Sequence, residues 1–233
     1  MVFFKEEGDF HAGALMLIDK PLHWTSFDVV NKVRYALRAK CGKIKVGHAG
    51  TLDPLATGLV MVCTGKWTKR IEEFMASEKE YVATVRFGAT TPSYDLEKEI
   101  DATYPYEHIT KELIESVLPQ FLGKIMQVPP LFSAIRIDGK RAYEKARKGS
   151  DEEPDAREIE IMELEILSYN APDLEIRVRC GKGTYIRSLA RDLGRVCQSG
   201  AHLIALRRTR SGEYSVNDAN NLEDLVAKLQ LND

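Results

Sequence analysis

Short apolar segments typical of β-strands are spread along the chain in an irregular order, and this order constrains the fold most. Residues 14–19 (ALMLID) and 59–63 (LVMVC) have the continuous apolar pattern of buried strands. Residues 81–87 and 174–180 instead alternate apolar and polar side chains. Hairpins and helices separate these segments in mixed order, unlike the regular alternation of a doubly wound sheet. We therefore predict an α+β fold with a mixed, mainly antiparallel sheet and flanking helices.

Helical periodicity accounts for several of the intervening segments. Thr25 and Ser26 are typical cap residues, and they precede a helix that we expect to bury Phe27, Val30, Val33 and Leu37. Further helices are predicted over 67–76, after Thr110, over 141–148, after Thr184 and near the end of the chain. In 157–168 the alternation of apolar residues changes phase, which indicates a β-bulge.

Length and composition are those of a globular protein. The chain has 233 residues, 44% of them apolar and 29% charged, with a formal net charge of −2, so it can bury a core without metal or disulfide support. No linker divides it. We predict a single domain over 1–233 with an insertion around 124–156.

Membrane spans, signal peptides and metal sites each have a recognisable sequence pattern. The longest apolar run, 59–63, is far shorter than the roughly 20 residues of a membrane span. The N-terminus carries acidic residues where a signal peptide has a basic and then an apolar region. Cysteines and histidines show no metal-ligand spacing. We predict a cytoplasmic protein with no membrane, metal or cofactor site.

Basic residues are concentrated in two windows. Residues 32–70 contain nine Lys or Arg and one acid, Asp53, and residues 177–210 contain nine Lys or Arg and one acid, Asp192. Each window thus has a formal charge of +8. Two interpretations remain open at this point, namely ordinary solvated helix faces or an anion-binding surface for a polyanion such as nucleic acid.

The segment GHAGTLDPLATG, residues 47–58, has the features of a functional loop. Its glycines permit a positive φ or a close approach to a ligand. Pro54 restricts Asp53 to an extended backbone, which presents the carboxylate. The basic surroundings favour the ionised form of Asp53, which suits a nucleophile or a general base. From these residues alone the other open interpretation, an Asx-turn in which Asp53 only shapes the loop, is the favoured one.

Five segments, taken together and in order, resemble one enzyme family. GHAGTLDPLATGLV resembles the catalytic signature of the TruB-type tRNA pseudouridine synthases. The other four segments that are similar to motifs of this family are LIDKPLHWTSFDVVNKVR (17–34), KEYVATVRFG (79–88), CGKGTYIRSLARDLG (180–194) and GAHLIALRR (200–208). Their order and spacing make the resemblance more specific than any single motif.

The resemblance implies roles for individual residues. Asp53 would be the catalytic aspartate, Tyr81 would stack on the target uracil, and Arg187 would pair with Asp53. Tyr185 and Leu206 would line the uracil pocket. The remaining positions carried over from the family are His48 beside the flipped nucleotide, Lys20 in the Lys-Pro motif and Asp95, whose neighbours depart from the family pattern.

The implied reaction is the isomerisation of uridine to pseudouridine at position 55, in the T-arm loop of tRNA. The family requires no cofactor and no obligate protein partner. The aspartate would assist cleavage of the glycosidic bond by attacking C1′, by adding to C6 or by removing a proton from C2′, and the sequence does not choose among these. Alternatives are a tRNA-binding or tRNA-folding chaperone, and a pseudouridine synthase for another RNA.

Contacts with RNA phosphates are expected from basic residues near these motifs. The candidates are Lys182, Arg191, Arg195, Arg207, Arg208 and the bases of the helix over 28–40. Members of the family usually continue into a small C-terminal RNA-binding (PUA) domain, which we do not expect here. We therefore predict that bases of the insertion contribute to tRNA binding, namely Arg136, Lys140, Arg141, Lys145, Arg147 and Lys148.

Overall fold

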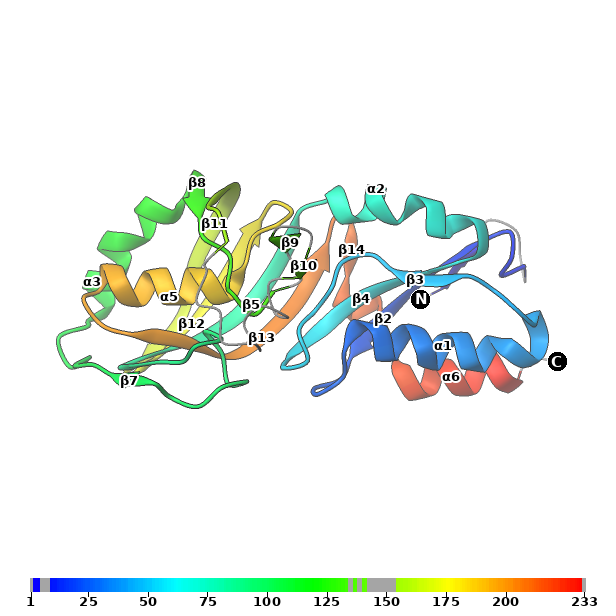
Figure 1. Ribbon diagram of the computed structural model, residues 1–233, viewed down its shortest axis with the longest axis horizontal. Coiled ribbons are helices and arrows are strands. Elements are labelled where there is room, and N and C mark those ends of the chain that lie inside the picture. The colour runs from blue at the N-terminus through cyan, green and yellow to red at the C-terminus, as the bar shows by residue number, and fades with distance from the viewer. Residues whose placement is uncertain (1, 5–8, 134–135, 138–139, 142–153, 232–233) are drawn as a thin grey trace. The chain divides into compact units, whose positions relative to one another are not determined.

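The computed structural model describes residues 2–4, 9–133, 136–137, 140–141 and 154–231. Two compact units make up the chain. Unit 1 consists of residues 1–81 and 206–233, and unit 2 of residues 82–205. Two strands, β5 (Lys79–Phe87) and β13 (Ala201–Ser211), contribute residues to both units. Figure 1 labels the elements of both units.

The strands of unit 1 form a sheet in the order β1-β2-β4-β13. β4 pairs antiparallel with β2, from Leu15 opposite Cys63 to Lys20 opposite Gly58, and parallel with β13. The strands of this unit, besides its parts of β5 and β13, are β1 (Val2–Phe4), β2 (Ala14–Lys20), β3 (Val46–His48), β4 (Ala56–Thr64), β14 (Tyr214–Ser215) and β15 (Asn220–Asn221). Its helices are α1 (Ser26–Cys41), α2 (Ile71–Ala76) and α6 (Leu222–Leu231).

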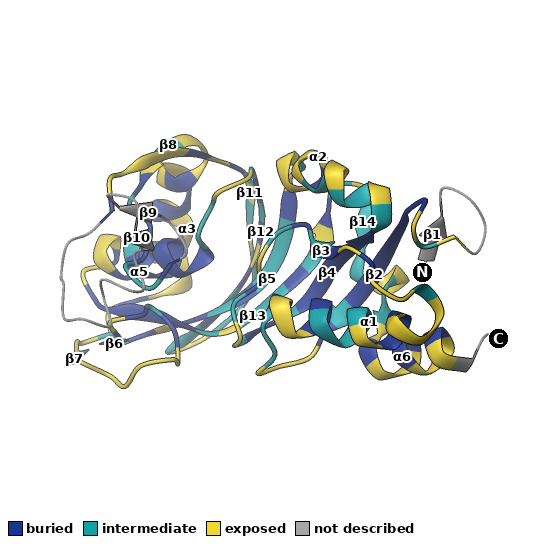
Figure 2. Cartoon of the chain, turned by 45° about the vertical axis from the view of Figure 1, so that its right-hand side comes forward, coloured by how far each residue is buried: buried dark blue, intermediate teal, exposed yellow. Residues whose placement is uncertain are grey.

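Apolar clusters cover both faces of this sheet, which explains why β2 and β4 are continuously apolar. On one face, Met16 and Val60 belong to a cluster with residues of α1 and α6, which lie side by side (Figure 1). We call this the helix-side cluster. On the other face, Leu17 and Met61 pack with Phe74 of α2. Figure 2 shows that β2 and β4 are buried and that the outer surfaces of α1 and α6 are exposed.

In unit 2 the strand order is β5-β12-β11-β8, and the pairs β11–β12 and β11–β8 are antiparallel. The other strands of this unit are β6 (Ala89–Thr90), β7 (Ala102–Thr103), β8 (Gly123–Gln127), β9 (Arg136–Ile137), β10 (Lys140–Arg141), β11 (Arg157–Asn170) and β12 (Asp173–Cys180). Its helices are α3 (Lys111–Val117) and α5 (Ile186–Val196). Buried residues of β12 alternate, from Leu174 to Cys180, as a sheet with one covered face requires.

The predicted α+β class, with a mainly antiparallel sheet, is confirmed. The predicted bulge is also confirmed, because the register between β11 and β12 shifts twice, between Ile161 and Glu163 and between Ile166 and Ser168. Among the residues described, no helix is long and apolar enough to cross a membrane.

Several local predictions are corrected. Phe27 is 59% exposed, because Val29 and Ala36, rather than Phe27, complete the buried side of α1. The helix predicted over 67–76 begins as a 3-10 helix at Gly65–Arg70 and becomes α-helical only in α2. Of the basic helix predicted over 141–148, Arg141 belongs to β10 and the rest lies outside the described residues.

Candidate active site

The loop between β3 and β4 contains Asp53 and has the backbone that its glycines predict. Gly50 and Gly58 have φ of +96° and +103°, a region that residues with side chains rarely adopt. Leu52 and Ala56, on either side of Asp53, are buried in the helix-side cluster. Asp53 itself is half-buried, and its carbonyl accepts a hydrogen bond from the amide of Ala56 at 3.1 Å. The packing of its neighbours therefore fixes the backbone that carries the carboxylate.

The start of α1 and the segment before it hold the residues that flank Asp53. The Leu52 amide donates to Ser26 Oγ at 2.8 Å, and the His23 amide donates to the Pro54 carbonyl at 2.8 Å. Ser26 is therefore not the helix cap that the sequence suggests. Thr25 is the cap, because its hydroxyl accepts from the amide of Asp28. The role of Ser26 was missed, since its partner lies 26 residues away.

Lys20, predicted at the site, is buried under the same loop at the end of β2. Its ammonium donates to the carbonyls of Trp24 at 2.5 Å and Pro54 at 3.4 Å. Burial lowers the pKa of Lys20 to about 8, although the Asp53 carboxylate favours the charged form. The structure therefore places this ammonium in the electrostatic field of Asp53.

Arg208 forms hydrogen bonds at both ends of the loop that contains Asp53. This side chain is only 2% exposed, and it donates through Nε to the Leu59 carbonyl at 2.7 Å and through Nη2 to the Gly50 carbonyl at 3.2 Å. A Cβ on Gly58 would lie 2.3 Å from the carbonyl oxygen of Arg208, so only glycine fits where β4 passes β13. The predicted phosphate contact is therefore wrong for Arg208, because its guanidinium is used inside the protein.

Three further predicted residues lie around this loop in unit 1. Tyr81 and Leu206 are half-buried and pack against the helix-side cluster, and Leu206 is in register with Ala56. His48 ends β3 and is half-buried. Burial lowers the pKa of His48, and the Arg208 charge acts in the same direction, so its neutral form is favoured. Unit 1 thus brings together five of the eight predicted site residues, including Asp53 and Lys20.

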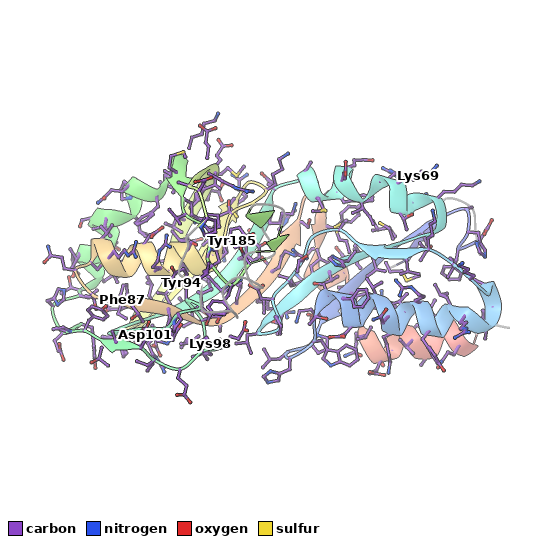
Figure 3. The ribbon with its side chains drawn as sticks, in the orientation of Figure 1. Lys69, Phe87, Tyr94, Lys98, Asp101 and Tyr185 are labelled. Carbon is purple, nitrogen blue, oxygen red and sulfur yellow. The ribbon has the colours of Figure 1, made fainter. Side chains whose placement is uncertain are left out.

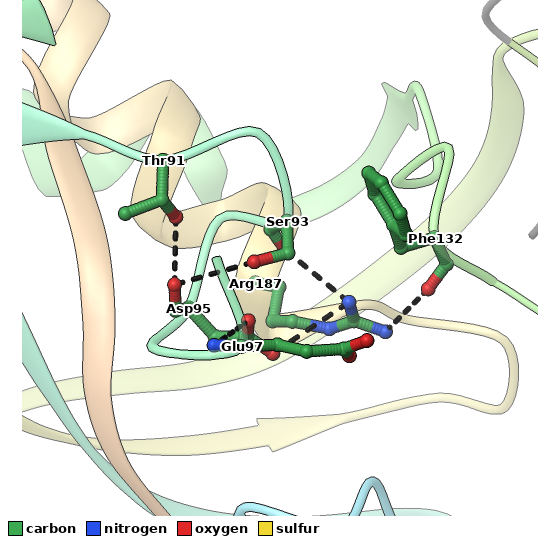
Figure 4. Close-up of polar contacts among 6 residues, drawn as sticks. All are labelled: Thr91, Ser93, Asp95, Glu97, Phe132 and Arg187. Carbon is green, nitrogen blue, oxygen red and sulfur yellow. Dashed lines mark hydrogen bonds and ion pairs between the residues drawn. The ribbon is translucent and has the colours of Figure 1, made fainter. Parts of the chain in front are cut away.

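Arg187, in the first turn of α5, is the centre of a buried polar cluster in unit 2 (Figure 4). It donates to the carbonyls of Ser93 at 3.2 Å and Phe132 at 3.0 Å, and it lies 3.7 Å from Asp95 Oδ2. The Asp95 loop is held in turn, because the Thr91 hydroxyl donates to the Asp95 carbonyl at 2.7 Å. Asp95 is thus the carboxylate partner of Arg187 in this unit. The expected pairing of Arg187 with Asp53 stays a prediction.

Tyr185 stands immediately before α5. Its backbone amide donates to Gln127 Oε1 at 2.8 Å, and its carbonyl accepts from Gln127 Nε2 at 3.1 Å. Gln127 is buried in β8. No sequence pattern indicates Gln127, because an isolated glutamine in a strand carries no signal of a distant partner.

Arg191, one turn further along α5, is also buried. Its guanidinium donates to Asp192 Oδ1 at 2.8 Å and to the hydroxyl of Tyr94 at 3.2 Å, and it lies over the Tyr94 ring. Tyr94 comes from the loop between β6 and β7, and Tyr185 from the turn before α5 (Figure 3). The predicted phosphate contact is wrong for Arg191 as well, because its guanidinium is buried and bonded to protein groups.

Several other bases of the two windows form ion pairs on the surface. Arg207 makes a bidentate contact with Asp19, at 3.0 and 2.7 Å, and Arg177 pairs with Glu165 at 2.6 Å. Lys182 and Arg195 are exposed and stay candidates for phosphate contacts. In the parts of the chain that the structure describes, no group of three His, Cys, Asp or Glu is arranged to hold a metal ion.

Comparison with known proteins assigns the whole of this arrangement to one family. Residues 35–186 match the model of the TruB family pseudouridylate synthase N-terminal domain, and residues 187–233 match the tRNA pseudouridylate synthase B C-terminal domain. A protein of Phocaeicola vulgatus named tRNA pseudouridine synthase B is 60% identical over 92% of this chain and 92% of its own length. A Parabacteroides distasonis protein of the same name is 58% identical over 96% of both chains.

Solved structures agree on the fold. A chain in the structure described as "Crystal Structure of a Cbf5-Nop10-Gar1 Complex" matches 97% of this chain with a TM-score of 0.71 and 28% identity. This chain spans 63% of that longer chain. The two family models together cover more than half of the chain and include the Asp53 loop, the Asp95 loop and α5. The chain therefore belongs to the TruB family of pseudouridylate synthases.

Proposed function

We propose that this TruB-family enzyme converts the uridine at position 55, in the T-arm loop of tRNA, to pseudouridine, with Asp53 as the catalytic residue. The observation that carries the proposal is the anchoring of Asp53 itself. Hydrogen bonds with Ser26 at the start of α1 and with His23 before it hold Leu52 and Pro54, and the charged Lys20 side chain lies under the same loop. The carboxylate is thus presented by a backbone that does not have to reorganise during the reaction.

The reaction is a rearrangement that needs no net oxidation or reduction. The bond between C1′ and N1 of the uridine breaks, the uracil turns, and C5 forms a bond to C1′, while C5 loses a proton and N1 gains one. Asp53 assists the cleavage by attack on C1′, by addition to C6 or by removal of the C2′ proton, and these three routes remain open. An ionised carboxylate is required in each of them.

The target base has to leave the RNA stack before a half-buried carboxylate can act on its nucleotide. Unstacking costs a few kcal/mol, which stacking on an aromatic ring and phosphate contacts offset. We assign the stacking role to Tyr81 and the walls of the uracil pocket to Tyr185 and Leu206. His48, which burial favours in its neutral form, would support the RNA where the base has been displaced.

The remaining assignments follow the same proposal. Arg187, held by Asp95 in unit 2, supplies positive charge to the site. Lys20 positions the Asp53 loop and adds a second positive charge. The substrate is tRNA, recognised through its T-arm, and we propose that the protein acts in the cytoplasm without an obligate protein partner.

An unmodified T-arm RNA hairpin tests the reaction and the role of Asp53 together. Wild-type protein and Asp53→Asn are incubated with the hairpin, and pseudouridine is mapped by carbodiimide labelling and primer extension. We expect conversion of the loop uridine by wild type and none by Asp53→Asn, because the amide cannot act as a nucleophile or base. Glu72→Gln, an exposed carboxylate in α2, is the matched control and should retain full activity.

Two results would contradict the proposal. Conversion by Asp53→Asn at the wild-type rate would exclude Asp53 as the catalytic residue. If wild type binds the hairpin without converting its uridine, this hairpin is not a sufficient substrate. That result would favour another RNA target or a chaperone role.

A further inference from the structure

Gln127 contacts both backbone polar groups of Tyr185, a residue that the proposed function places in the uracil pocket. Its side-chain amide accepts from the Tyr185 N–H at 2.8 Å and donates to the Tyr185 carbonyl at 3.1 Å. We infer that Gln127 is a positioning residue, which sets the orientation of Tyr185 for the flipped uracil through these two bonds. The inference rests on the proposed function.

The geometry of the two bonds restricts the peptide planes on both sides of Tyr185. One planar amide is bonded to the N–H and to the C=O of the same residue, in the way that a neighbouring strand is in an antiparallel pair. Gln127 is only 2% exposed, so water does not compete for these bonds. Rotation of Tyr185 about its φ or ψ would break at least one of these two hydrogen bonds. The same rotation would change the direction of the ring.

The start of α5 depends on this support, because it lacks an ordinary cap. Tyr185 occupies the N-cap position, and no side-chain cap hydrogen bond is present there. Tyrosine has no short acceptor that could bond the first free amides of a helix, unlike Ser, Thr, Asp or Asn. The contact from β8 therefore takes over part of the task that a capping side chain performs elsewhere.

The residues that follow Gln127 continue the same attachment. The Val128 carbonyl accepts from the Ser188 hydroxyl at 2.8 Å and from Arg191 at 3.3 Å. The Phe132 carbonyl accepts from Arg187 at 3.0 Å. Residues 127–132 thus lie along the first turns of α5 and hold Tyr185 and Arg187 in one rigid arrangement. From the sequence we expected these residues to belong to an RNA-binding insertion. In the structure their backbone carbonyls instead contact α5 and position residues of the proposed site.

The test uses the full-length protein and an unmodified tRNA labelled with tritium at uracil C5, since pseudouridine formation releases that hydrogen. Gln127→Leu removes both bonds, and Met126→Ala, 65% exposed on the same strand, is the matched control. We expect Gln127→Leu to lower the single-turnover rate about 10- to 100-fold, because small misplacements near a reacting group have effects of this size. The Kd for tRNA, measured by filter binding, should change less than about threefold, and Met126→Ala should match wild type in both.

A double-mutant cycle separates positioning from a general loss of structure. If Gln127 acts through Tyr185, Gln127→Leu should cost little extra once Tyr185→Ala has removed the ring. Effects that multiply independently would overturn the inference, and so would an unchanged rate for Gln127→Leu. Failure of wild type to release tritium would instead overturn the proposed function, so the two failures are distinguishable.

Gln127→Glu provides a second test in case Gln127→Leu does not fold. A neutral carboxylic acid can donate to the Tyr185 carbonyl and accept from its amide, whereas a carboxylate can only accept. The rate of Gln127→Glu relative to wild type should therefore rise as the pH falls from about 8 to 5.5. A ratio independent of pH would contradict the inference.

Discussion

The two units hold their buried cations in different ways. In unit 1, Lys20 and Arg208 donate to backbone carbonyls of the loop that carries Asp53. In unit 2, Arg187 and Arg191 also donate to backbone carbonyls, but each has a carboxylate beside it as well, Asp95 and Asp192. A cation that is solvated by carbonyls alone fixes the backbone and keeps its full charge, whereas a carboxylate beside a cation offsets part of that charge.

This difference suits the roles that we propose. The Asp53 loop has to stay in place while its carboxylate reacts, and the buried cations of unit 1 hold that loop through its backbone carbonyls. The cluster in unit 2 has to hold α5 and its first residues in place, and the nearby carboxylates offset part of the charge of its buried bases. Substitutions in each unit test this difference.

The largest effect is expected for Arg208→Leu in unit 1. The carbonyls of Gly50 and Leu59 would lose a charged donor, at about 1.5–3 kcal/mol for each bond. We expect the free energy of unfolding, measured with urea, to fall by about 4 kcal/mol. Arg210→Leu, at an exposed position of the same strand, should change it by less than about 0.5 kcal/mol. Equal effects of the two substitutions would refute the role of Arg208 as a clamp.

Gly58→Ala tests the close approach of β4 and β13. The added Cβ would meet backbone atoms of Arg208 at 2.3 and 2.8 Å, and φ is +103° there. We expect a loss of about 3 kcal/mol in thermal unfolding, from strain and overpacking together. Gly42 also has a positive φ, of +58°, but a Cβ there would meet nothing within 4 Å. Gly42→Ala should therefore cost only about 1 kcal/mol, and a similar cost at Gly58 would exclude the steric explanation.

Asp95→Asn removes the charge of the pair in unit 2 while keeping an oxygen for the Glu97 amide. Arg187 would then be buried opposite a neutral group, and we expect a loss of about 2 kcal/mol in urea unfolding. Glu99→Gln, exposed in the same loop, is the control and should be neutral. A neutral result for Asp95→Asn would show that the carbonyls of Ser93 and Phe132 alone sustain the Arg187 charge, as carbonyls do in unit 1.

The effect per pH unit is smallest for the titration of Lys20. Its pKa is lowered to about 8, so between about pH 8 and its ordinary value near 10.5 the folded chain has lost a proton that the unfolded chain retains. Stability should therefore rise with pH across this window relative to Lys20→Met, by at most about 1.4 kcal/mol per pH unit. Below the window both states are protonated, and the cost of burying the ammonium remains in full.

Asp53→Asn sharpens the same measurement. The Asp53 carboxylate raises the pKa of Lys20 against the larger effect of burial, so its neutralisation should move the lower edge of the window to a lower pH. NMR titration of the Lys20 side chain measures this shift directly. An unchanged titration would mean that Lys20 does not sense Asp53.

Much of this molecule could be predicted from local patterns. The strands over 14–19 and 174–180 follow from apolar periodicity, which depends only on neighbours along the chain. The Thr25 cap and the glycines of the Asp53 loop follow from backbone restrictions of single residues. The family follows from motifs of the same local kind.

Burial of the polar residues could not be predicted in this way. Arg208 and Arg191 have the sequence context of surface bases, yet partners from other elements bury both. Phe27 fits the apolar side of α1 by its spacing, yet it is exposed, because Val29 and Ala36 face the sheet instead. The buried face of a helix can be misplaced in this way because the periodicity of apolar residues gives the width of the face and not its exact centre.

The fold class, the family and the glycine-rich loop around Asp53 could be predicted from the sequence, because each depends on residues that are neighbours in the chain. The side chains that hold this loop and α5 in place could be identified only in the folded chain. Ser26, Arg208 and Gln127 act through hydrogen bonds to residues 26, 149 and 58 positions away. The energy of such bonds depends on burial and on distances between atoms of different elements, and neither is set until the chain has folded.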